Sequence, residues 1–294
     1  SFSTIDPFLM DIAACIQADL EDTVSQFMFR FQEKTGAKKL YYSGGVALNI
    51  NSNSRLEQLG YFDELHIPPC CNDAGLALGA AALLEFIEKG EVKRHSVFLN
   101  SLGIGPYHYQ PQFDVREIAD RIARNEVIGI CVGNGETGPR ALGHRSLIAS
   151  PCSREIRERV SISMKKREWY RPVAPMVLNS EADKLFENVT SSNLSRYMLG
   201  SYMVRPEARA QIPGVVHVDG SARVQVVEEN DPELRLVVDI LKELRDVHGI
   251  RCVINTSFNR KGEPIVHTFD EALTAGEVMG IDAVILDNSL VNFD

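Results

Sequence analysis

The 294-residue sequence has no apolar run near the roughly 20 residues that a membrane-spanning helix needs. It also shows no basic segment followed by an apolar core near its amino terminus, so we expect no signal peptide. Its six cysteines include no C-x-x-C pair, which favours reduced thiols in a cytoplasm over a zinc site or a disulfide framework. Walker A and H-E-x-x-H motifs are missing as well.

The composition is that of an ordinary globular protein. Hydrophobic residues make up 44% and charged residues 24% of the chain, which excludes disordered, collagen-like and coiled-coil classes. At about 150 residues per domain, the length predicts two domains or one large one.

The charge is unevenly distributed. The chain carries a net charge of −9, yet residues 140–171 contain nine basic and three acidic residues. A nucleic-acid surface usually makes a whole domain basic, so a positive island in an acidic chain favours a pocket for a small anion. A solvated helix face with intrahelical ion pairs explains the charge equally well.

Hydrophobic spacing and turn residues predict strands and helices that interleave irregularly, which indicates an α+β or mixed α/β fold. Helices are expected over 5–34, 46–59, 72–90, 114–124, 151–169, 234–247 and 270–279. Strands are expected at 38–42, 64–68, 127–132, 173–178, 197–204, 215–218, 223–227, 251–255 and 283–286. The mixed segment 92–112 marks a domain boundary, and 133–146 is expected to be a loop.

Two glycine-rich segments could carry chemistry. Gly44 and Gly45 in S-G-G-V-A-L-N allow backbone N–H groups to approach a phosphate or nucleoside, and Asp73 either holds a metal or caps a helix. The segment G-N-G-E-T-G-P-R-A-L-G-H-R-S forms a shaped loop from which Arg140, His144 and Arg145 project. Arginine suits forked contacts with phosphate or carboxylate. We expect Glu136 to orient one of these guanidiniums; a plain surface turn is the alternative.

Three further segments add cations and hydroxyls. M-K-K-R-E-W-Y-R contributes an ammonium from Lys165 or Lys166, with Arg167 and Arg171 on either side of Trp169. H-V-D-G-S-A-R-V-Q contains Arg223, and N-T-S-F-N contains Ser257 and Asn259. Hydroxyls at a strand end bind phosphate or adenylate, and they also simply form turns.

Together with D-A-G-L-A-L-G-A-A, which begins at Asp73, the chain has six such segments in one order along essentially its whole length. In this it resembles the NodU/CmcH-type O-carbamoyltransferases. The resemblance implies the second half of an ASKHA-type domain over 1–95, a linker over 96–111 and a YrdC-like α/β domain over 112–294 that forms carbamoyladenylate. It covers the later part of the family pattern; the family's longer N-terminal region, with its histidine-containing metal motif, is not among these residues.

The implied activity is O-carbamoyl transfer from carbamoyl phosphate, with ATP, through carbamoyladenylate to a hydroxyl of a small-molecule acceptor. Mg²⁺ would accompany the nucleotide, and iron or another divalent metal would bind the ASKHA-type domain only together with that N-terminal half. The expected location is the cytoplasm, without nucleic-acid or membrane partners. An uncovered sheet of a half-domain would favour a homodimer.

By motif match, the resemblance assigns Arg140 and Arg145 to carbamoyl phosphate, and Lys165 and Arg223 to the adenylate phosphates, as catalytic residues. Asp73 matches the metal-ligand carboxylate. The implied substrate- and nucleotide-binding residues are His144, Arg167, Ser257, Asn259, Gly44, Gly45 and Asn49.

Two other functions remain open. One is synthesis of threonylcarbamoyl-adenylate for tRNA modification, against which the acidic remainder of the chain argues. The other is a nucleotide-binding fragment without turnover.

Overall fold

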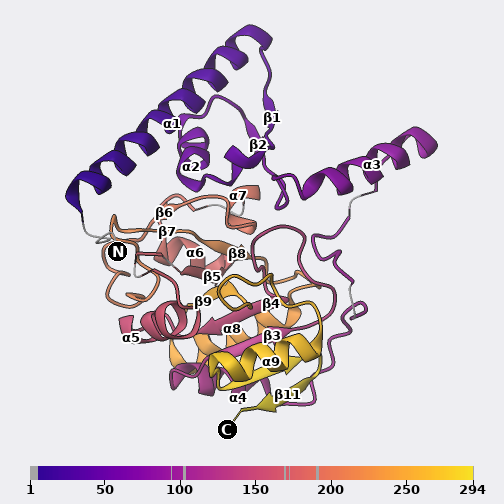
Figure 1. Ribbon diagram of the computed structural model, residues 1–294, viewed down its shortest axis with the longest axis vertical. Coiled ribbons are helices and arrows are strands. Elements are labelled where there is room, and N and C mark those ends of the chain that lie inside the picture. Colours follow the sequence, from indigo (N-terminus) through magenta and orange to yellow (C-terminus); the bar gives the residue numbers. More distant parts are fainter. Residues whose placement is uncertain are drawn as a thin grey trace.

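The computed structural model describes residues 6–93, 95–101, 104–168, 170–171, 173–189 and 192–293. Among these residues no helix is both long enough and apolar enough to cross a membrane. The N-terminal region lies at the top of Figure 1, where α3 projects away from the body of the molecule. It consists of α1 (Pro7–Thr35), β1 (Lys39–Tyr41), a 3-10 turn (Gly45–Leu48), α2 (Ile50–Leu59), β2 (Glu64–His66) and α3 (Gly75–Lys89).

Helix α1 has well-defined ends. The Asp6 side chain accepts from the backbone N–H of Phe8, Pro7 occupies the first turn, and Gly36 ends the helix in the left-handed conformation. Met28 of α1 packs with Leu56 of α2 in a small core. Most other large hydrophobic side chains of α1 are exposed, and α3 has no buried residue.

The C-terminal region is an α/β domain in the lower part of Figure 1. Its elements are α4 (Val115–Ala123), β3 (Ile128–Cys131), β4 (Arg145–Ala149), α5 (Arg154–Glu158), a π-helix (Arg159–Met164), β5 (Ala174–Leu178), α6 (Asn179–Leu185), α7 (Asn193–Arg196), β6 (Tyr202–Met203), β7 (Ser221–Ala222), β8 (Gln225–Val227), α8 (Arg235–His248), β9 (Cys252–Ser257), α9 (Phe269–Met279), β10 (Ala283–Leu286) and β11 (Ser289–Asn292).

A mixed seven-stranded sheet, in the order β11-β10-β3-β4-β9-β5-β8, forms the centre of this domain. Strand side chains alternate between the two faces of a sheet. Leu147 and Ala149 of β4 therefore enter the core that includes α9, while Ile148 between them enters the core with α4 and α8. Figure 1 shows α9 in front of the sheet and α8 behind it, so the domain has three layers with β4 and β9 at the centre of the middle one.

The two regions are joined by buried polar contacts. Asn53 of α2 is fully buried, and its Nδ2 donates to the carbonyl of Leu199 at 2.9 Å. The backbone N–H of Ser201 donates to Ser54 Oγ at 2.7 Å. Gly138 has φ +108°, and a Cβ there would lie 2.4 Å from the carbonyl oxygen of Pro69. The glycine thus lets the 133–146 segment lie directly against the N-terminal region.

Several expectations need correction. The loop was expected to end at residue 146, and no strand was expected after it, but residues 145–149 form the central strand β4. Residues 215–218 form no strand. The strand expected at 197–204 is reduced to β6, and α6, α7 and β11 were not predicted. Part of the expected linker is buried in the domain, since Phe98 and Ile104 are 5% and 6% exposed. The six cysteines are free, as predicted.

Candidate anion-binding site

The segment between β3 and β4 is organised by a buried carboxylate. Oε1 of Glu136 accepts from the backbone N–H groups of Leu142, His144 and Arg145 at 2.7, 2.9 and 3.0 Å. The prediction that Glu136 orients a guanidinium is therefore wrong: it holds the backbone of the loop. Its second oxygen, Oε2, is buried without a hydrogen-bond partner among the described residues.

The same segment has G-x-G-x-x-G spacing over residues 133–138. In dinucleotide-binding folds such a loop leads into a helix whose N-terminus faces the phosphates. Here it leads into β4, which runs antiparallel to β3. The loop therefore offers an anion no helix N-terminus.

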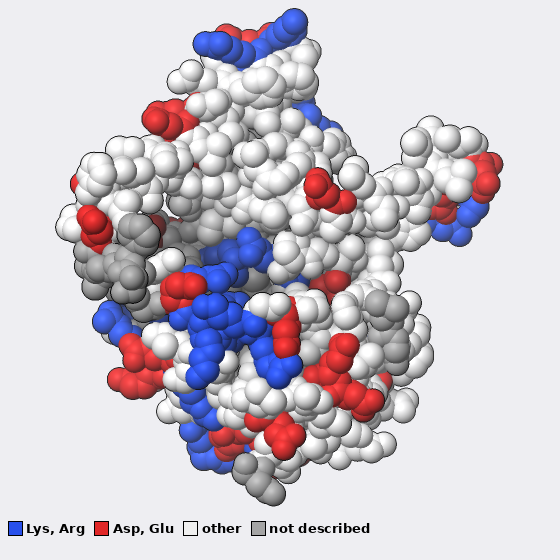
Figure 2. Space-filling view, in the orientation of Figure 1, with Lys and Arg blue, Asp and Glu red and all other residues white. Residues whose placement is uncertain are grey.

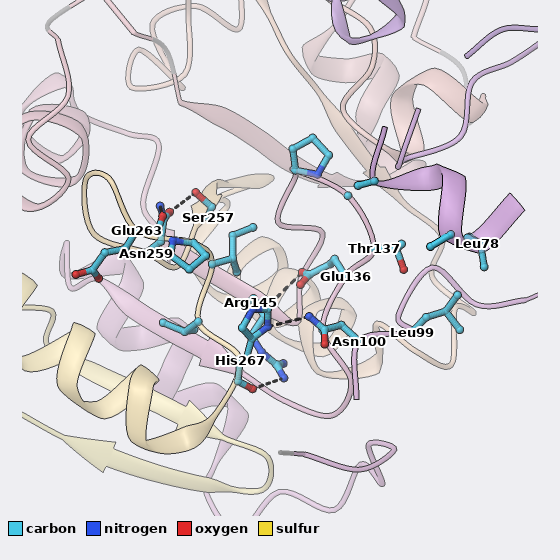
Figure 3. Close-up of a pocket in the computed structure, with 18 residues that line it drawn as sticks. Leu78, Leu99, Asn100, Glu136, Thr137, Arg145, Ser257, Asn259, Glu263 and His267 are labelled. Carbon is cyan, nitrogen blue, oxygen red and sulfur yellow. Dashed lines mark hydrogen bonds between the residues drawn. The ribbon is translucent and has the colours of Figure 1, made fainter. Parts of the chain in front are cut away.

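Arg145, the first residue of β4, is 2% exposed, and its four terminal N–H groups are engaged by backbone carbonyls. Nη1 donates to Val132 and His144, and Nη2 donates to Gly133 and His267, at 2.7 to 3.2 Å. Only Nε remains without a partner among the described residues. Figure 3 shows this guanidinium at one wall of a cavity of about 720 Å³ that Glu136 also lines. Arg145 has one donor left for a ligand.

His144 is a packed structural residue. Its ring stacks on Phe98 with 3.7 Å between centroids. Nδ1 lies 2.7 Å from the carbonyl oxygen of Asn134, and Nε2 lies 2.8 Å from that of Glu233. Both nitrogens already have partners, so the structure leaves no ring atom for the substrate contact predicted from the sequence.

Lys165 follows the π-helix and is 2% exposed. Its Nζ donates to Ser257 Oγ at 2.9 Å and to Asn259 Oδ1 at 2.7 Å, and it also contacts the carbonyl of Ser257. No carboxylate pairs with it among the residues that the structure describes. Burial, with the nearby charges of Arg167 and Arg171, lowers the pKa of Lys165 to about 6.

Three further arginines share this environment. Burial, together with the charges of neighbouring guanidiniums, lowers the pKa of Arg167 to about 10 and that of Arg223 to about 9. The pKa of Arg140 is lowered by burial and by Arg171. We call Arg140, Lys165, Arg167, Arg171 and Arg223 the cation cluster.

The cation cluster has almost no counter-charge. Its single ion pair within the described part of the chain joins Arg171 to Glu168 at 3.5 Å, on the exposed side. Figure 2 shows lysine and arginine side chains gathered in a hollow between the two regions of the molecule. Buried like charges without partners are costly, and a bound polyanion removes that cost. The arrangement is that of an anion-binding site.

A second cavity, of about 340 Å³, lies where the two regions meet. Asn49 from the N-terminal region lines it together with Arg140, Arg223 and His217. Asn49 also caps α2 through its contact with the N–H of Ser52. The predicted binding residue Asn49 is thus placed beside two predicted catalytic arginines.

Two family models match the chain, Carbamoyltransferase C-terminus over residues 119–292 and Carbamoyltransferase N-terminus over residues 4–82. The chain belongs to the carbamoyltransferase family. It is 33% identical over 301 residues to nodulation protein NolO of Bradyrhizobium diazoefficiens, an alignment covering 96% of this chain and 54% of the relative. With nodulation protein U of Sinorhizobium fredii it shares 35% identity over 261 residues, covering 87% and 45%. The predicted resemblance is confirmed.

This carbamoyltransferase chain spans about half the length of the curated relatives it matches. Solved structures similar to it include full-length HypF in its phosphate- and nucleotide-bound form, with a TM-score of 0.42, 17% identity and coverage of 72% of this chain and 26% of that one. Sua5 of P. abyssi complexed with L-threonine gives a TM-score of 0.42 at 14% identity, covering 63% and 50%.

Not all predicted residues of the carbamoyltransferase chain meet at the cluster. Gly44 and Gly45 begin the 3-10 turn and line neither of the two cavities. Asp73 is exposed, and no group of three or more His, Cys, Asp and Glu side chains among the described residues could hold a metal ion. Asp73 alone therefore does not form the metal site that the resemblance implies. Trp169 lies outside the described residues.

The sequence did not predict that Gln225 and Asn255, which are far along the chain from the Arg140 loop, form hydrogen bonds to that loop. Asn255 Nδ2 donates to the carbonyl of Ala141 and to Gln225 Oε1, and Gln225 Nε2 donates to the carbonyl of Leu142. These amides fix the loop that carries Arg140. His217 was not predicted as a site residue, yet it lines the cavity together with Arg223. The signal in the sequence is that His217 begins the H-V-D-G-S-A-R-V-Q segment that contains Arg223.

Proposed function

We propose that the cation cluster binds carbamoyl phosphate and the phosphates of ATP, and that the C-terminal domain forms carbamoyladenylate. The carbamoyl group would then pass to a hydroxyl of a small-molecule acceptor. The observation that carries this proposal is that the five basic side chains of the cation cluster lie near one another, and that only Arg171 forms an ion pair, with Glu168, among the described residues. Membership of the carbamoyltransferase family supplies the group that is transferred.

The chemistry requires stabilisation of phosphoryl charge. Hydrolysis of carbamoyl phosphate yields phosphate and carbamate. A carbamate oxygen then bonds to the α-phosphorus of ATP while the bond to pyrophosphate breaks, and acceptor attack on carbamoyladenylate releases AMP. Preorganised cations at the developing oxyanions account for most of the rate enhancement in such reactions. Mg²⁺ bound to ATP would neutralise part of the same charge.

The residue roles follow from donors that remain available. Arg140 and Arg223 each keep a buried Nε without a partner among the described residues, which suits them to carbamoyl phosphate and adenylate phosphates. Lys165 is already close to Ser257 and Asn259. A phosphate beside this ammonium would raise its lowered pKa and restore its charge. Arg145 would contribute only its Nε and the position of the loop.

The N-terminal region would be the second half of an ASKHA-type domain that carries out the transfer to the acceptor. Gly44, Gly45 and Asn49 would contact nucleotide there. The described residues do not assemble a metal site around Asp73, so no step of the proposed reaction is assigned to a metal in this region.

The direct test is release of pyrophosphate from ATP by the 294-residue protein, with and without carbamoyl phosphate. We expect release that depends on carbamoyl phosphate and that falls at least about tenfold in Lys165→Ala and Arg223→Ala, since each removes a charged contact. Arg154→Ala is the matched control, because Arg154 lies in the same basic segment but is exposed.

The outcomes separate the other functions. Saturable ATP binding without pyrophosphate release would identify a nucleotide-binding protein without turnover. Release that depends on threonine and bicarbonate instead of carbamoyl phosphate would identify an enzyme of the threonylcarbamoyl-adenylate type. Either result rejects the proposal.

A further inference from the structure

The cavity between the two regions is lined by residues that carry buried, unpaired nitrogen atoms. The Nε atoms of Arg140 and Arg223 and the Nε2 atom of His217 are buried and lack hydrogen-bond partners among the described residues. All three residues line the same cavity of about 340 Å³. Buried polar atoms of native proteins are nearly always paired, so three orphaned atoms on residues that line one cavity point to a bound ligand.

The hydrogen bonds around His217 fix its tautomer. Ser221 Oγ donates its single proton to Asp219 Oδ1 at 2.7 Å. His217 Nδ1 lies 3.2 Å from the same hydroxyl oxygen. Because that oxygen has no second proton to give, Nδ1 must carry a hydrogen and donate it. In a neutral imidazole the lone pair is then on Nε2, which is an acceptor without a partner among the described residues.

The imidazole stays neutral in this environment. Burial lowers the pKa of His217 to about 4; Asp219 opposes the shift, whereas the charges of Arg223 and Arg157 add to it. At neutral pH the cavity therefore presents two guanidinium donors and one imidazole acceptor.

We propose that His217 Nε2 accepts a hydrogen bond from the amino group of carbamoyl phosphate while Arg140 and Arg223 bind its phosphoryl oxygens. This inference rests on the proposed function and deepens it, by making His217 the residue that selects a carbamoyl group. Acetyl phosphate has a similar shape and charge but presents a methyl group at that point, leaving Nε2 buried and unpaired. Sites built to pair a ligand N–H discriminate strongly against analogues that lack it. The ribose hydroxyls of ATP lie many more bonds from the reacting phosphate.

Two substitutions of His217 distinguish the role of its Nε2 acceptor from that of the rest of the side chain. His217→Asn keeps an amide near Nδ1 that can still donate to Ser221, and it removes the acceptor at Nε2. His217→Gln places an amide oxygen near the Nε2 position. We expect His217→Asn to raise the KM for carbamoyl phosphate about tenfold, the worth of one hydrogen bond. The KM for ATP and the inhibition constant of acetyl phosphate should stay within about twofold, and His217→Gln should recover part of the loss.

Ser221→Ala is an independent variant that keeps the imidazole. It removes the acceptor of Nδ1–H and lets the ring adopt either tautomer, so a rise of about threefold in the same KM is expected. Protection from thermal unfolding by acetyl phosphate and by carbamoyl phosphate gives a second readout that needs no turnover.

The two levels of the proposal fail differently. Absence of carbamoyl phosphate-dependent pyrophosphate release in the unsubstituted protein rejects the proposed function. If release occurs but His217→Asn prefers carbamoyl over acetyl phosphate as strongly as before, the role of His217 is rejected while the function stands. A rise in the KM for ATP alone would place a ribose hydroxyl at Nε2 and also reject it.

Discussion

The two arginines of P-R-A-L-G-H-R, Arg140 and Arg145, lie five residues apart in the sequence but have opposite environments. Arg145 is buried at the start of β4 and satisfies four backbone carbonyls. Arg140 lines a cavity between the two regions, and no carboxylate of the described residues forms an ion pair with it, while Arg171 lies near enough to lower its pKa. One arginine holds the loop together, and the other presents its charge to that cavity.

The difference shows how a fold separates stability from function within one motif. A buried guanidinium whose four terminal N–H groups are all paired stabilises the native state because its removal leaves buried carbonyls unpaired. A guanidinium among like charges destabilises the native state until an anion arrives. Substitutions on the two sides of the loop should therefore change different measurements.

The largest effect is expected for Arg145→Ala. It leaves the carbonyl oxygens of Val132 and Gly133 buried without their donors, at about 1–3 kcal/mol each. We expect the free energy of unfolding, measured by chemical denaturation, to fall by about 3 kcal/mol or more. Arg154→Ala, at an exposed arginine, should change it by less than about 0.5 kcal/mol. An Arg145→Ala protein of unchanged stability would show that the carbonyl contacts do not hold the loop.

Arg140→Met should give the reverse pattern. Removing one charged contact to a phosphoryl group costs about 2 kcal/mol of transition-state stabilisation, which is about 30-fold in kcat/KM for carbamoyl phosphate. The free energy of unfolding should stay the same or rise, because an unpaired cation near Arg171 is lost. Parallel losses of stability and activity would place Arg140 with Arg145 as a structural residue.

Lys165 extends the comparison to the pH dependence of the free energy of unfolding. Its pKa is lowered to about 6 in the folded protein and is about 10.4 in an unfolded chain. Below pH 6 the ammonium is charged in both states, and the folded state carries the full cost of burying it. As the pH rises from 6 toward 10.4, the folded state is neutral first, so this destabilisation disappears.

The stability advantage of Lys165→Met over the unsubstituted protein should therefore be largest near pH 6 and shrink steadily toward pH 10. Chemical denaturation of both proteins at a series of pH values measures the difference, in which other titrating groups cancel. A difference independent of pH would contradict the burial of an unpaired ammonium at this position.

The sequence predicted the longer helices and most strands because their periodicity is local. The long pattern of α1 and the apolar stripes of α4 and α8 appear where the residue spacing places them. The segment at 215–218 is rich in β-branched residues, yet it lies in the turn that brings His217 to Ser221. Strand β4 was missed because it begins with an arginine, three of whose four carbonyl acceptors lie 12 to 122 residues away.

The same limit applies to the site. Arg140, Lys165, Arg223, Ser257 and Asn259 could be selected from sequence, because cations and hydroxyls in glycine-rich segments are typical of phosphate sites. Which of two arginines is satisfied by carbonyls, and which histidines line a cavity, depends on contacts between distant segments. Both ring nitrogens of His144 contact carbonyl oxygens, whereas Nε2 of His217 has no partner among the described residues.

The smallest effect is expected for Glu136→Gln, on the stabilising side of the loop. The amide oxygen can still accept from the N–H groups of Leu142, His144 and Arg145 that Oε1 now pairs, but it loses the charge that strengthens these bonds. We expect a loss of about 1 kcal/mol in the free energy of unfolding, and at least twice that for Glu136→Ala, which leaves the three donors unpaired. Denaturation curves of both variants give the ratio. Equal losses in the two variants would mean that the negative charge of Glu136, rather than the position of its acceptor oxygen, holds the loop. The stability of the loop would then depend on electrostatics, as the binding role of Arg140 does.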